Sequence, residues 1–452
     1  MPTGKPTLLT SGNPAKRIIV FALPLLAGEF LQVFYTMADA FIVGHWLGID
    51  GLAAVGATYN LVSFVFGFII GLTGGFAVIT TQRVGLGDEQ GIRRSIATAL
   101  ELCFVITVVL TLALLPLTPF ILRLIRTPAE IITDSLNYIT IMFSGIIVFM
   151  FYNMLASIIQ AGGDSLTPTI FLIMGNIINI ILAVLFVAVF SWGIRGAAAA
   201  TVISEFIAVI LTFQFLLRRF RTLLPRRQDW RADWPGIRSH LSLGIVMGLQ
   251  RSIVEVGNIL VQTAINGLGP VTIAAVSAAQ RVRGLNMMPL FSMFRAMTTY
   301  TAQNYGAGRM DRVYKGVFQA SLISLGLGIF MAVLNQFTGA PIVSLFLKDS
   351  QEAIALARQY ILFTGYTVFI LGIMLVFRSV LQGLGKKTAP TLSSVLETVM
   401  SILAAFVLIP HLGFTGVCLV NPLSWLASGI PLYIAFGRLK KELGKGDNTI
   451  IE

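Results

Sequence analysis

The chain has 452 residues, of which 56% are hydrophobic and only 12% are charged, and its net charge is +12. Charged side chains make up about 25% of a typical soluble protein, and a soluble core of this size could not bury so much apolar surface. The composition therefore excludes a soluble globular protein. The basic residues lie between apolar runs, which indicates contact with a membrane surface rather than with nucleic acid.

Twelve membrane-spanning helices are predicted, because each needs about 20 predominantly apolar residues. Six lie in the first part of the chain, at residues 17–43, 52–81, 93–115, 133–160, 166–190 and 196–217. Six more follow at residues 239–265, 271–302, 314–337, 354–382, 388–409 and 414–437. We therefore expect an all-α integral membrane protein. Its predicted parts are a six-helix bundle, a basic cytoplasmic linker, a second six-helix bundle and a cytoplasmic tail, at residues 1–217, 218–238, 239–437 and 438–452.

The first predicted helix carries a polar face inside the membrane. At 100° per residue, four polar side chains fall within about 80° of arc, namely Glu29, Gln32, Thr36 and Asp39. Pro24 precedes them and removes a backbone donor, which predicts a kink. Ionisable side chains inside a membrane are costly and mark functional sites by default, so the two carboxylates are candidate functional groups.

Three later helices of the first half also hold polar groups. Asn176 and Asn179 share a face of the fifth helix, and Thr201 and Glu205 lie one turn apart on the sixth. Glu101 lies nearer the inner end of the third helix, where its side chain can reach water. Asparagines in membrane helices often tie helices together, but this pair is expected to line a cavity.

The second half carries mostly arginines instead. On the seventh helix, one polar face of about 60° is formed by Arg251, Glu255, Asn258 and Gln262. On the eighth helix, one stripe is formed by Ser277, Arg281, Ser292 and Arg295. Arg378 and Glu397 add one charge of each sign to the tenth and eleventh helices. Because Arg251 and Glu255 lie one turn apart, we expect an ion-paired polar network around Glu255.

The distribution of lysine and arginine predicts the orientation in the membrane. If the N-terminus lies inside, 22 of the 32 basic residues fall in inner segments and 4 in outer loops. Inner segments of membrane proteins carry the excess of basic residues. The chain is therefore predicted to be a multi-pass protein of the cell membrane with both termini in the cytoplasm. The arginine-rich linker is expected to be solvated and anchored by its tryptophans, with binding of anionic lipid headgroups as the alternative.

The two halves of the chain resemble each other at an offset of 221 or 222 residues. Matched positions include Gln82 with Gln303, Gly85 with Gly306, and Pro168 with Pro390. Because each half has an even number of spans, both halves have the same orientation. We expect them to be related by a pseudo-twofold axis along the membrane normal, and repeats of this kind are the usual architecture of secondary transporters.

Several stretches are similar to one transporter family. The first helix and its sequel contain LPLLAGEFLQVFYTMADAFIVGHWLG and GLAAVGAT, and corresponding helices of the two halves end with TTQRVGLGD and TAQNYGAGR. Across essentially the whole chain, the sequence resembles the MATE (multidrug and toxic compound extrusion) family. The resemblance implies twelve helices in two bundles, alternating access, and export of mostly cationic organic compounds in exchange for protons or sodium ions.

The resemblance also implies roles for individual residues. Pro24 matches the family's kink in the first helix. Gln32 and Asp39 match its polar pair, with Asp39 as the cation-coupling carboxylate. Asn179 and Thr201 match cation-site positions, so a sodium ion used for coupling would bind at Asp39, Asn179 and Thr201. No other metal and no cofactor are expected.

One position departs from the family pattern. The family's fifth helix commonly carries an aspartate four residues after the position of Asn179, and this chain has Ala183 there. We expect Glu205 of the sixth helix to supply the missing carboxylate. The first half would then hold three carboxylates, those of Glu29, Asp39 and Glu205. Their mutual repulsion is relieved by protonation, which favours protons over sodium as the coupling ion.

The predicted substrate cavity draws on both halves. Its lining residues are Glu29, Gln32, Tyr35, Asn153, Asn176, Arg251 and Glu255. The pattern of the first helix is typical of the DinF-like branch, which is favoured, whereas Glu255 is typical of the NorM-like branch.

The predicted function is secondary active efflux of small, mostly cationic organic molecules by a monomer in the lipid bilayer. The alternatives are a flippase of the same superfamily that moves lipid-linked or other amphiphiles, and an ion-conducting channel. The chain has no HExxH and no GxxxxGK[ST] motif, so neither an enzyme nor ATP-driven transport is expected. No nucleic-acid partner is expected either.

Overall fold

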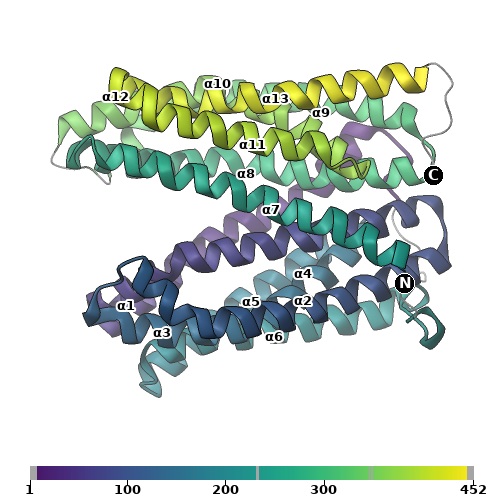
Figure 1. Ribbon diagram of the computed structural model, residues 1–452, viewed down its shortest axis with the longest axis horizontal. Coiled ribbons are helices and arrows are strands. Elements are labelled where there is room, and N and C mark those ends of the chain that lie inside the picture. The colour runs from purple at the N-terminus through teal and green to yellow at the C-terminus, as the bar shows by residue number, and fades with distance from the viewer. Residues whose placement is uncertain (1–7, 231–233, 346, 348–349, 445–452) are drawn as a thin grey trace. The chain divides into compact units, whose positions relative to one another are not determined.

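The computed structural model describes residues 8–230, 234–345, 347 and 350–444. Every regular element in these residues is a helix (Figure 1). Parts of the predicted linker and of the predicted tail, residues 231–233 and 445–452, lie outside the described residues.

Helices α1 to α6 form the first half of the chain, and a short π-helix, η1, continues α5. Their bounds are Pro14–Leu86 (α1), Glu89–Leu124 (α2), Ala129–Ser144 (α3), Ile146–Ala161 (α4), Leu166–Val184 (α5), Leu185–Val189 (η1) and Gly193–Arg219 (α6). Two 3₁₀ turns follow, η2 (Arg221–Leu223) and η3 (Arg227–Asp229).

Helices α7 to α13 form the second half, and a second π-helix, η4, continues α11. Their bounds are Trp234–Asn266 (α7), Pro270–Gly306 (α8), Met310–Ser344 (α9), Gln351–Gly383 (α10), Thr388–Leu403 (α11), Ala404–Leu408 (η4), Ile409–Leu412 (α12) and Phe414–Gly444 (α13).

Nine of the described helices are long and apolar enough to cross a membrane, and the bent pair α3 and α4 makes a tenth candidate. Helix α1 has 73 residues and is broken at Gly48, so its two parts are about 51 and 57 Å long and each is long enough for one crossing. Helix α8 is also long enough to cross a membrane, but it is less apolar than these helices because it contains arginines and other polar residues. With α8 counted as a crossing and α1 as two, all twelve predicted spans are helical, which confirms the predicted all-α membrane fold.

The break in α1 lies at Gly48 and not at Pro24. Gly48 adopts φ 71° and ψ −163°, a conformation that a residue without a Cβ atom reaches at no steric cost. Pro24 lies inside the helix and does not interrupt it, because one missing N–H removes a single backbone hydrogen bond. The helix is thus continuous at Pro24, and the predicted kink there stays a prediction.

The chain folds as two compact units. Unit 1 contains Leu23–Gly248, and unit 2 contains Leu9–Ala22 and Leu249–Glu452. Helices α1 and α7 therefore each run from one unit into the other. The unit boundaries differ from the predicted domain boundaries at residues 217 and 239. The reason is that a long helix can pack its two ends in different units, whereas hydropathy marks only where a span begins and ends.

Close glycine contacts hold the first part of α7 in unit 1. A Cβ atom added to Gly75 of α1 would lie 2.6 Å from the Cα atom of Gly244, and one added to Gly71 would lie 2.7 Å from the Cα atom of Gly248. Small residues at such contacts let membrane helices approach closely. The pairing of four glycines thus explains why residues 234–248 belong to unit 1.

Buried arginines tie down the segments that precede α1 and α7. In unit 1, Arg93 of α2 forms an ion pair with Asp229, with 3.2 Å between Nε and Oδ2. In unit 2, Arg312 of α9 donates hydrogen bonds of 3.1 and 2.9 Å to the carbonyl oxygens of Leu9 and Gly12. The side chain of Asp229 is fully buried. The described part of the predicted linker is therefore docked against α2 rather than fully solvated.

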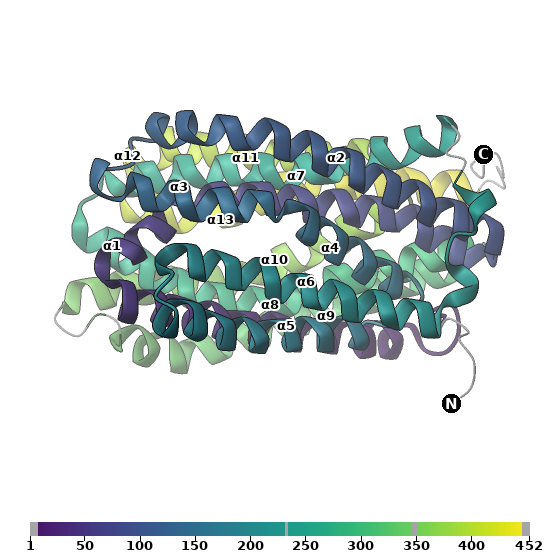
Figure 2. The same ribbon diagram turned by 90° about the horizontal axis from the view of Figure 1, so that it is seen from below.

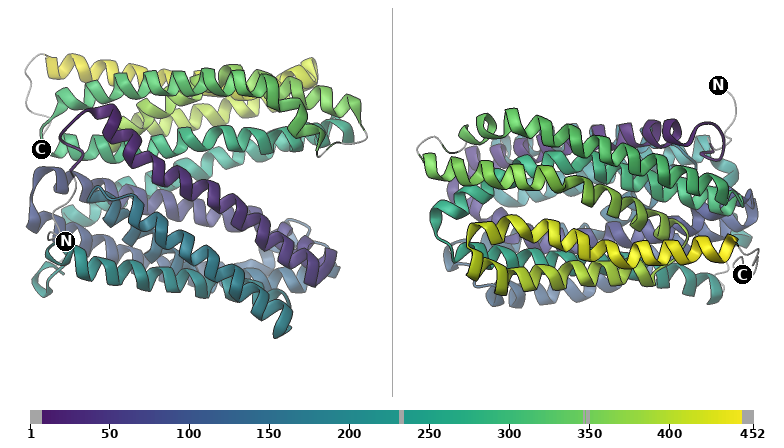
Figure 3. Two further views of the ribbon diagram at one scale, coloured as in Figure 1. Left: turned by 180° about the vertical axis from the view of Figure 1, so that it is seen from behind. Right: turned by 90° about the horizontal axis from the view of Figure 1, so that it is seen from above.

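Each unit has its own apolar core. In unit 1, α1, α3 and α4 contribute the fully buried side chains of Phe76, Phe143 and Met150. In unit 2, α10 and α13 contribute Met374 and Trp425. Helices α5 and α6 lie side by side in unit 1 (Figure 2). In unit 2, α11 lies along α13 (Figure 3), and α8 packs against α9 and α10. These pairs hold the polar faces of the membrane helices in place.

Candidate cation-coupling site

The polar face of α1 lies in unit 1. Glu29, Gln32, Tyr35 and Asp39 are all half-buried there. Thr36 is exposed, and its hydroxyl donates to the carbonyl oxygen of Gln32 at 2.9 Å. Thr36 is therefore satisfied by its own helix, and the other four side chains remain as the functional face of α1.

Helices α1, α5 and α6 meet at the hydroxyl of Thr201. The Asn179 side-chain amide of α5 donates to Thr201 Oγ1 at 3.1 Å. Thr201 in turn donates to the carbonyl oxygen of Ala197 at 3.2 Å, and it is hydrogen-bonded to the Tyr35 side chain of α1. Asn179 is only 2% exposed, so its bond to Thr201 is a buried polar contact between α5 and α6, and the binding of a cation by these two residues stays a prediction.

Two buried oxygens of this site have no hydrogen-bond partner, Oδ1 of Asp39 and Oδ1 of Asn179. Buried acceptors are nearly always satisfied, so each of these atoms can accept a further ligand. Tyr35 and Tyr138 lie close enough to Asp39 to interact electrostatically with its carboxylate. In the described part of the chain, no three His, Cys, Asp or Glu side chains group as a metal site. Carboxylate, amide and hydroxyl oxygens suit a hard cation or a proton on the carboxylate.

A second polar bridge connects the same helices. The Asn176 side-chain amide of α5 donates to Gln32 Oε1 of α1 at 3.0 Å. Asn153 of α4, also predicted to line the cavity, donates to the carbonyl oxygen of Phe149 at 2.8 Å. Asn153 is thus bonded to its own helix, whereas Asn176 and Gln32 hold α1 against α5.

The position that departs from the family pattern is filled by apolar packing. Ala183 is completely buried and packs in a cluster with Ile42, Val43 and Phe186. Glu205 of α6 is half-buried and, like Asp39, lies near enough to Tyr35 to interact with it electrostatically. The two carboxylates therefore lie near the same tyrosine.

Two features around this site were not predicted from the sequence. One is Tyr138 of α3, an aromatic residue with no distinctive spacing. The other is η1, which has a counterpart, η4, at the corresponding place in the second half. A Cβ atom at Gly416 would lie 2.5 Å from the carbonyl oxygen of Leu408 in η4, and one at Gly196 would lie 3.1 Å from that of Phe186 in η1. These repeated glycines were the available signal, and π-helices often occur at functional sites.

An ion-paired network was predicted around Glu255, but the ion pair that unit 2 buries does not include this residue. Glu255 is exposed and accepts from the Asn258 amide at 3.1 Å, and Arg251 is also exposed. The buried ion pair joins Arg378 and Glu397, at 2.8 Å. Its members come from consecutive helices, α10 and α11. The sequence placed both charges in the membrane, but it could not pair them because the pairing depends on how α10 packs against α11.

Two serines complete this buried network. Arg378 Nη2 donates at 2.8 Å to Ser393 Oγ and at 2.9 Å to Ser428 Oγ. Arg378 is thus held by α11 and α13 together, and its charge is balanced by the carboxylate of Glu397. The geometry is that of a structural contact within unit 2.

Comparison with known proteins identifies the family. The MatE family profile matches residues 24–185 and 247–407, one segment in each half. The chain belongs to the MatE family. This membership confirms the resemblance described above and the repeat of two halves. This MatE protein is thus a multi-pass membrane transporter with small-molecule substrates, and not an enzyme.

Relatives and solved structures cover nearly the whole chain. The probable multidrug resistance protein YpnP of Bacillus subtilis (strain 168) is 27% identical over 95% of this chain and 97% of its own length. Another relative is named FAD transporter and comes from Shewanella oneidensis (strain ATCC 700550 / JCM 31522 / CIP 106686 / LMG 19005 / NCIMB 14063 / MR-1). It is 24% identical over 94% of this chain and 95% of its own length. An outward-facing MATE family multidrug resistance transporter superimposes with a TM-score of 0.89 at 20% identity, covering 99% of this chain and 100% of that one.

Proposed function

We propose that this MatE protein is a secondary active multidrug efflux antiporter, which exports organic compounds in exchange for inward protons or sodium ions. Both termini lie in the cytoplasm, and the monomer is the working unit, with no nucleic-acid partner. The names of the relatives support efflux of organic molecules, and the excess of basic residues in the predicted inner segments supports the orientation.

The observation that carries the coupling proposal is the pair of unpartnered oxygens in unit 1, Asp39 Oδ1 and Asn179 Oδ1. Each oxygen has room for one more ligand, and the hydroxyl of Thr201 lies beside Asn179. A cation would be bound by such oxygens, whereas a proton would bind to the Asp39 carboxylate itself. Either ion removes the negative charge of Asp39 from the membrane interior.

Coupling follows from the difference between the loaded and the empty site. A carboxylate without its cation is costly inside the membrane, so the empty site favours the access state in which Asp39 meets water. Binding of the cation removes that preference. A ligand shifts the balance of the two access states only by its difference in affinity for them, so substrate and cation must prefer opposite states.

The choice between protons and sodium depends on the neighbouring carboxylates. Glu205 lies near the same tyrosine as Asp39, and Glu29 is on the same face of α1. Three carboxylates in one unit repel one another, and protonation relieves that repulsion, which supports protons as the coupling ion. In Glu205→Gln we therefore expect the pH dependence of efflux to change, whereas an unchanged dependence would remove Glu205 from the coupling site.

The direct test uses the whole protein in proteoliposomes loaded with a fluorescent organic compound. A pH gradient and a sodium gradient are imposed separately, each with the cation more concentrated outside. We expect release of the compound to accelerate with one of the two gradients, with the pH gradient favoured. Acceleration by neither gradient would refute the antiporter, and ion flux without release of the compound would support a channel.

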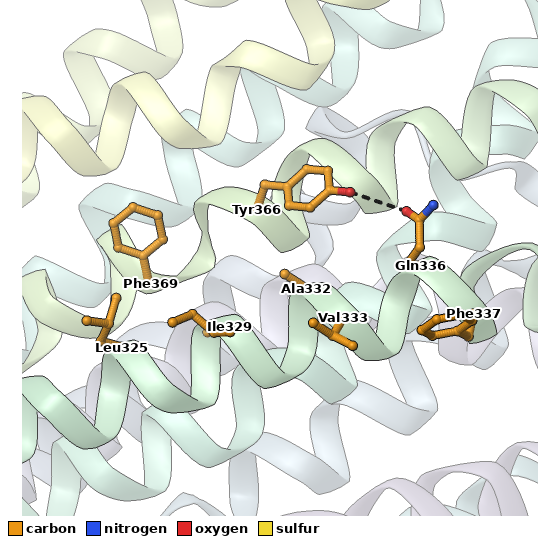
Figure 4. A pocket seen from close by; sticks show the side chains of 9 residues that line it. Leu325, Ile329, Ala332, Val333, Gln336, Phe337, Tyr366 and Phe369 are labelled. Carbon is orange, nitrogen blue, oxygen red and sulfur yellow. Dashed lines mark hydrogen bonds between the residues drawn. The ribbon is translucent and has the colours of Figure 1, made fainter.

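One observation favours a second function, the movement of amphiphiles. A groove of about 490 Å³ lies between α9 and α10, lined by Ile329, Val333 and Phe369 among other apolar side chains (Figure 4). At one end, the Tyr366 hydroxyl donates to Gln336 Oε1 at 3.3 Å. An acyl chain fits this apolar lining, with a polar headgroup at the tyrosine. A flippase would move a fluorescent phospholipid between leaflets, which a dithionite quenching assay measures.

A further inference from the structure

The segment between α6 and α7 is held at one membrane end of unit 1. The guanidinium group of Arg93 forms an ion pair with Asp229 of η3 at 3.2 Å and donates to the carbonyl oxygen of Thr222 in η2 at 3.4 Å. The Ser95 hydroxyl of α2 is hydrogen-bonded to His240 Nε2 of α7 at 3.0 Å. Arg93 is the first residue of the predicted span in α2, so η2, η3 and the start of α7 all lie near the level where α2 enters the membrane.

The same segment exposes a group of arginines. Its exposed arginines, which no ion pair among the described residues includes, are Arg218, Arg221, Arg226 and Arg227. Arg226 is held by its backbone N–H, which donates to Asp229 Oδ2 at 2.9 Å, and Arg221 precedes Thr222 in the sequence. The contacts of Arg93 therefore fix the backbone of the segment and leave these guanidinium groups available to other partners.

Positive charge remains at this end of unit 1 however its side chains pair. Residues 82–94, 161–165 and 218–238 contain ten arginines and five carboxylates, a surplus of five positive charges. The contacts of Arg93 bring the first and third stretches together. A Cβ atom added to Gly162 would lie 3.1 Å from the ring of Phe220, which places the second stretch beside them. Clusters of about four to eight basic residues directly after a membrane helix are typical of segments that bind anionic lipids.

An apolar stripe of α6 leads to these arginines. At 100° per residue, four side chains that are between 39% and 52% exposed fall within about 60° of arc, namely Phe206, Ile210, Phe213 and Leu217. The stripe is about 17 Å long, close to half of a hydrocarbon core of about 30 Å. Arg218 and Arg221 lie within four residues of its end. A phospholipid with an acyl chain on this stripe would therefore have its headgroup at the arginines.

Two tryptophans border the arginines. Trp230 follows η3 and Trp234 begins α7, and they are 46% and 70% exposed. Trp230 is next to Asp229, which Arg93 holds at the end of the predicted span. Counted along α7 from His240, Trp234 lies about 9 Å farther from the membrane core, near the outer limit of a headgroup region about 5–8 Å thick. Tryptophans are enriched at this depth in membrane proteins, so both rings suit an interface with headgroups.

We propose that the surface formed by Arg218, Arg221, Arg226, Arg227, Trp230 and Trp234, which we call the linker surface, binds the headgroups of anionic phospholipids in the adjacent leaflet. The proposed orientation makes this the cytoplasmic leaflet. The proposal goes beyond efflux and does not depend on it. Of the two expectations for the arginine-rich linker, it favours lipid binding over a solvated segment.

The test measures which lipid lies beside the two tryptophans. The full chain is reconstituted into bilayers of phosphatidylcholine and phosphatidylglycerol, and bromine, which quenches tryptophan fluorescence, is placed on the acyl chains of one lipid or of the other. Trp46→Phe with Trp192→Phe removes the exposed tryptophans at the other end of unit 1, and Trp425 is only 4% exposed. Quenching by lipid then reports on Trp230 and Trp234.

We expect the linker surface to prefer phosphatidylglycerol over phosphatidylcholine roughly fivefold or more, because each basic residue near an anionic surface adds about that factor. The preference should fall steeply in about 1 M sodium chloride, where charges are screened within about 3 Å. Equal quenching by the two brominated lipids would show a solvated linker and overturn the proposal.

Variants locate the preference on the linker surface. The triple variant Arg221→Gln, Arg226→Gln and Arg227→Gln should bind the two lipids about equally, whereas lysine at the same three positions should keep most of the preference. The matched control is Arg123→Gln with Arg126→Gln, two exposed arginines at the other end of α2, and it should behave as the wild type. The midpoint of thermal unfolding is measured for each variant to show that it is folded.

Two further results would overturn the proposal. A preference for phosphatidylglycerol that survives in the glutamine triple variant would place lipid binding elsewhere on the chain. Inorganic phosphate, compared with sodium chloride at equal ionic strength, should lower the preference no more than chloride does. A larger loss in phosphate would identify a free anion, and not a membrane headgroup, as the ligand of these arginines. No gradient is imposed in these measurements, so their outcome is independent of the antiporter.

Discussion

In unit 1, the charged side chains away from the ends of the predicted spans are carboxylates, Glu29, Asp39, Glu101 and Glu205, whereas the spans of unit 2 carry mainly arginines. Both units descend from one repeated pattern of helices, and each keeps a π-helix at the same place. The shared pattern therefore accounts for the fold, and the two units differ in the sign of the charges that their membrane helices carry.

The largest expected effect tests whether a carboxylate of unit 1, that of Asp39, couples transport to a cation. Asp39→Asn keeps the size and polarity of the side chain but cannot hold a proton or pair with a cation. We expect gradient-driven release from proteoliposomes to fall roughly 100-fold or more, because contacts of a charged group are worth up to about 3 kcal/mol. Asp50→Asn, an exposed carboxylate of the same helix, is the control and should transport normally. Wild-type release by Asp39→Asn, at equal protein content, would disprove the coupling role.

The second expected effect concerns the neutral pair buried in unit 2. Glu397→Gln leaves the Arg378 guanidinium buried without its counter-charge, and breaking such a pair destabilises by about 3–5 kcal/mol. We expect a lower midpoint of thermal unfolding in detergent. The double variant Arg378→Met with Glu397→Leu removes both charges and should recover much of the loss. A single variant as stable as the wild type would show that the pair is not a structural element.

The third expected effect compares the arginines that hold the segments before α7 and α1. Arg93→Met leaves Asp229 buried without its counter-charge, although the backbone N–H of Arg226 still donates to it, at a cost of about 3 kcal/mol. Arg312→Met deprives backbone carbonyls of their donor, which costs about 1–3 kcal/mol. We expect both variants to unfold at lower temperature, Arg93→Met more so. Exposed Arg309→Met is the control. The opposite order would mean that the ion pair of unit 1 contributes less than the hydrogen bonds of unit 2.

The smallest expected effect refines the cation site. Thr201→Val removes the hydroxyl that accepts from Asn179, and one hydrogen bond contributes about 1 kcal/mol, or roughly fivefold in affinity. We expect the cation concentration that half-saturates release to rise by that factor, with little change in maximal rate. Thr201→Ser keeps the hydroxyl and should restore the wild-type value. If both variants behave alike, the hydroxyl does not contribute to the site.

Much of the fold followed from local patterns in the sequence. Runs of about 20 apolar residues mark spans wherever they occur, since a membrane accepts a helix only when its own backbone groups are satisfied. For the same reason, polar residues inside those runs indicated Asp39, Asn179 and Thr201 before any contact was known. The repeat at an offset of 221 residues predicted two halves, which the family profile confirms.

The tertiary structure decided which groups meet. Asn179 bonds to Thr201 only because α5 packs along α6, and Arg378 pairs with Glu397 and not with Glu255 because α10 lies near α11. The first part of α7 belongs to unit 1 because of the close approach of four glycines, which no hydropathy pattern records. Hydropathy can be calculated for each segment by itself, whereas a hydrogen bond or an ion pair forms only when packing brings two segments close together. The sequence therefore determines which helices enter the membrane, and packing determines which of their side chains form a site.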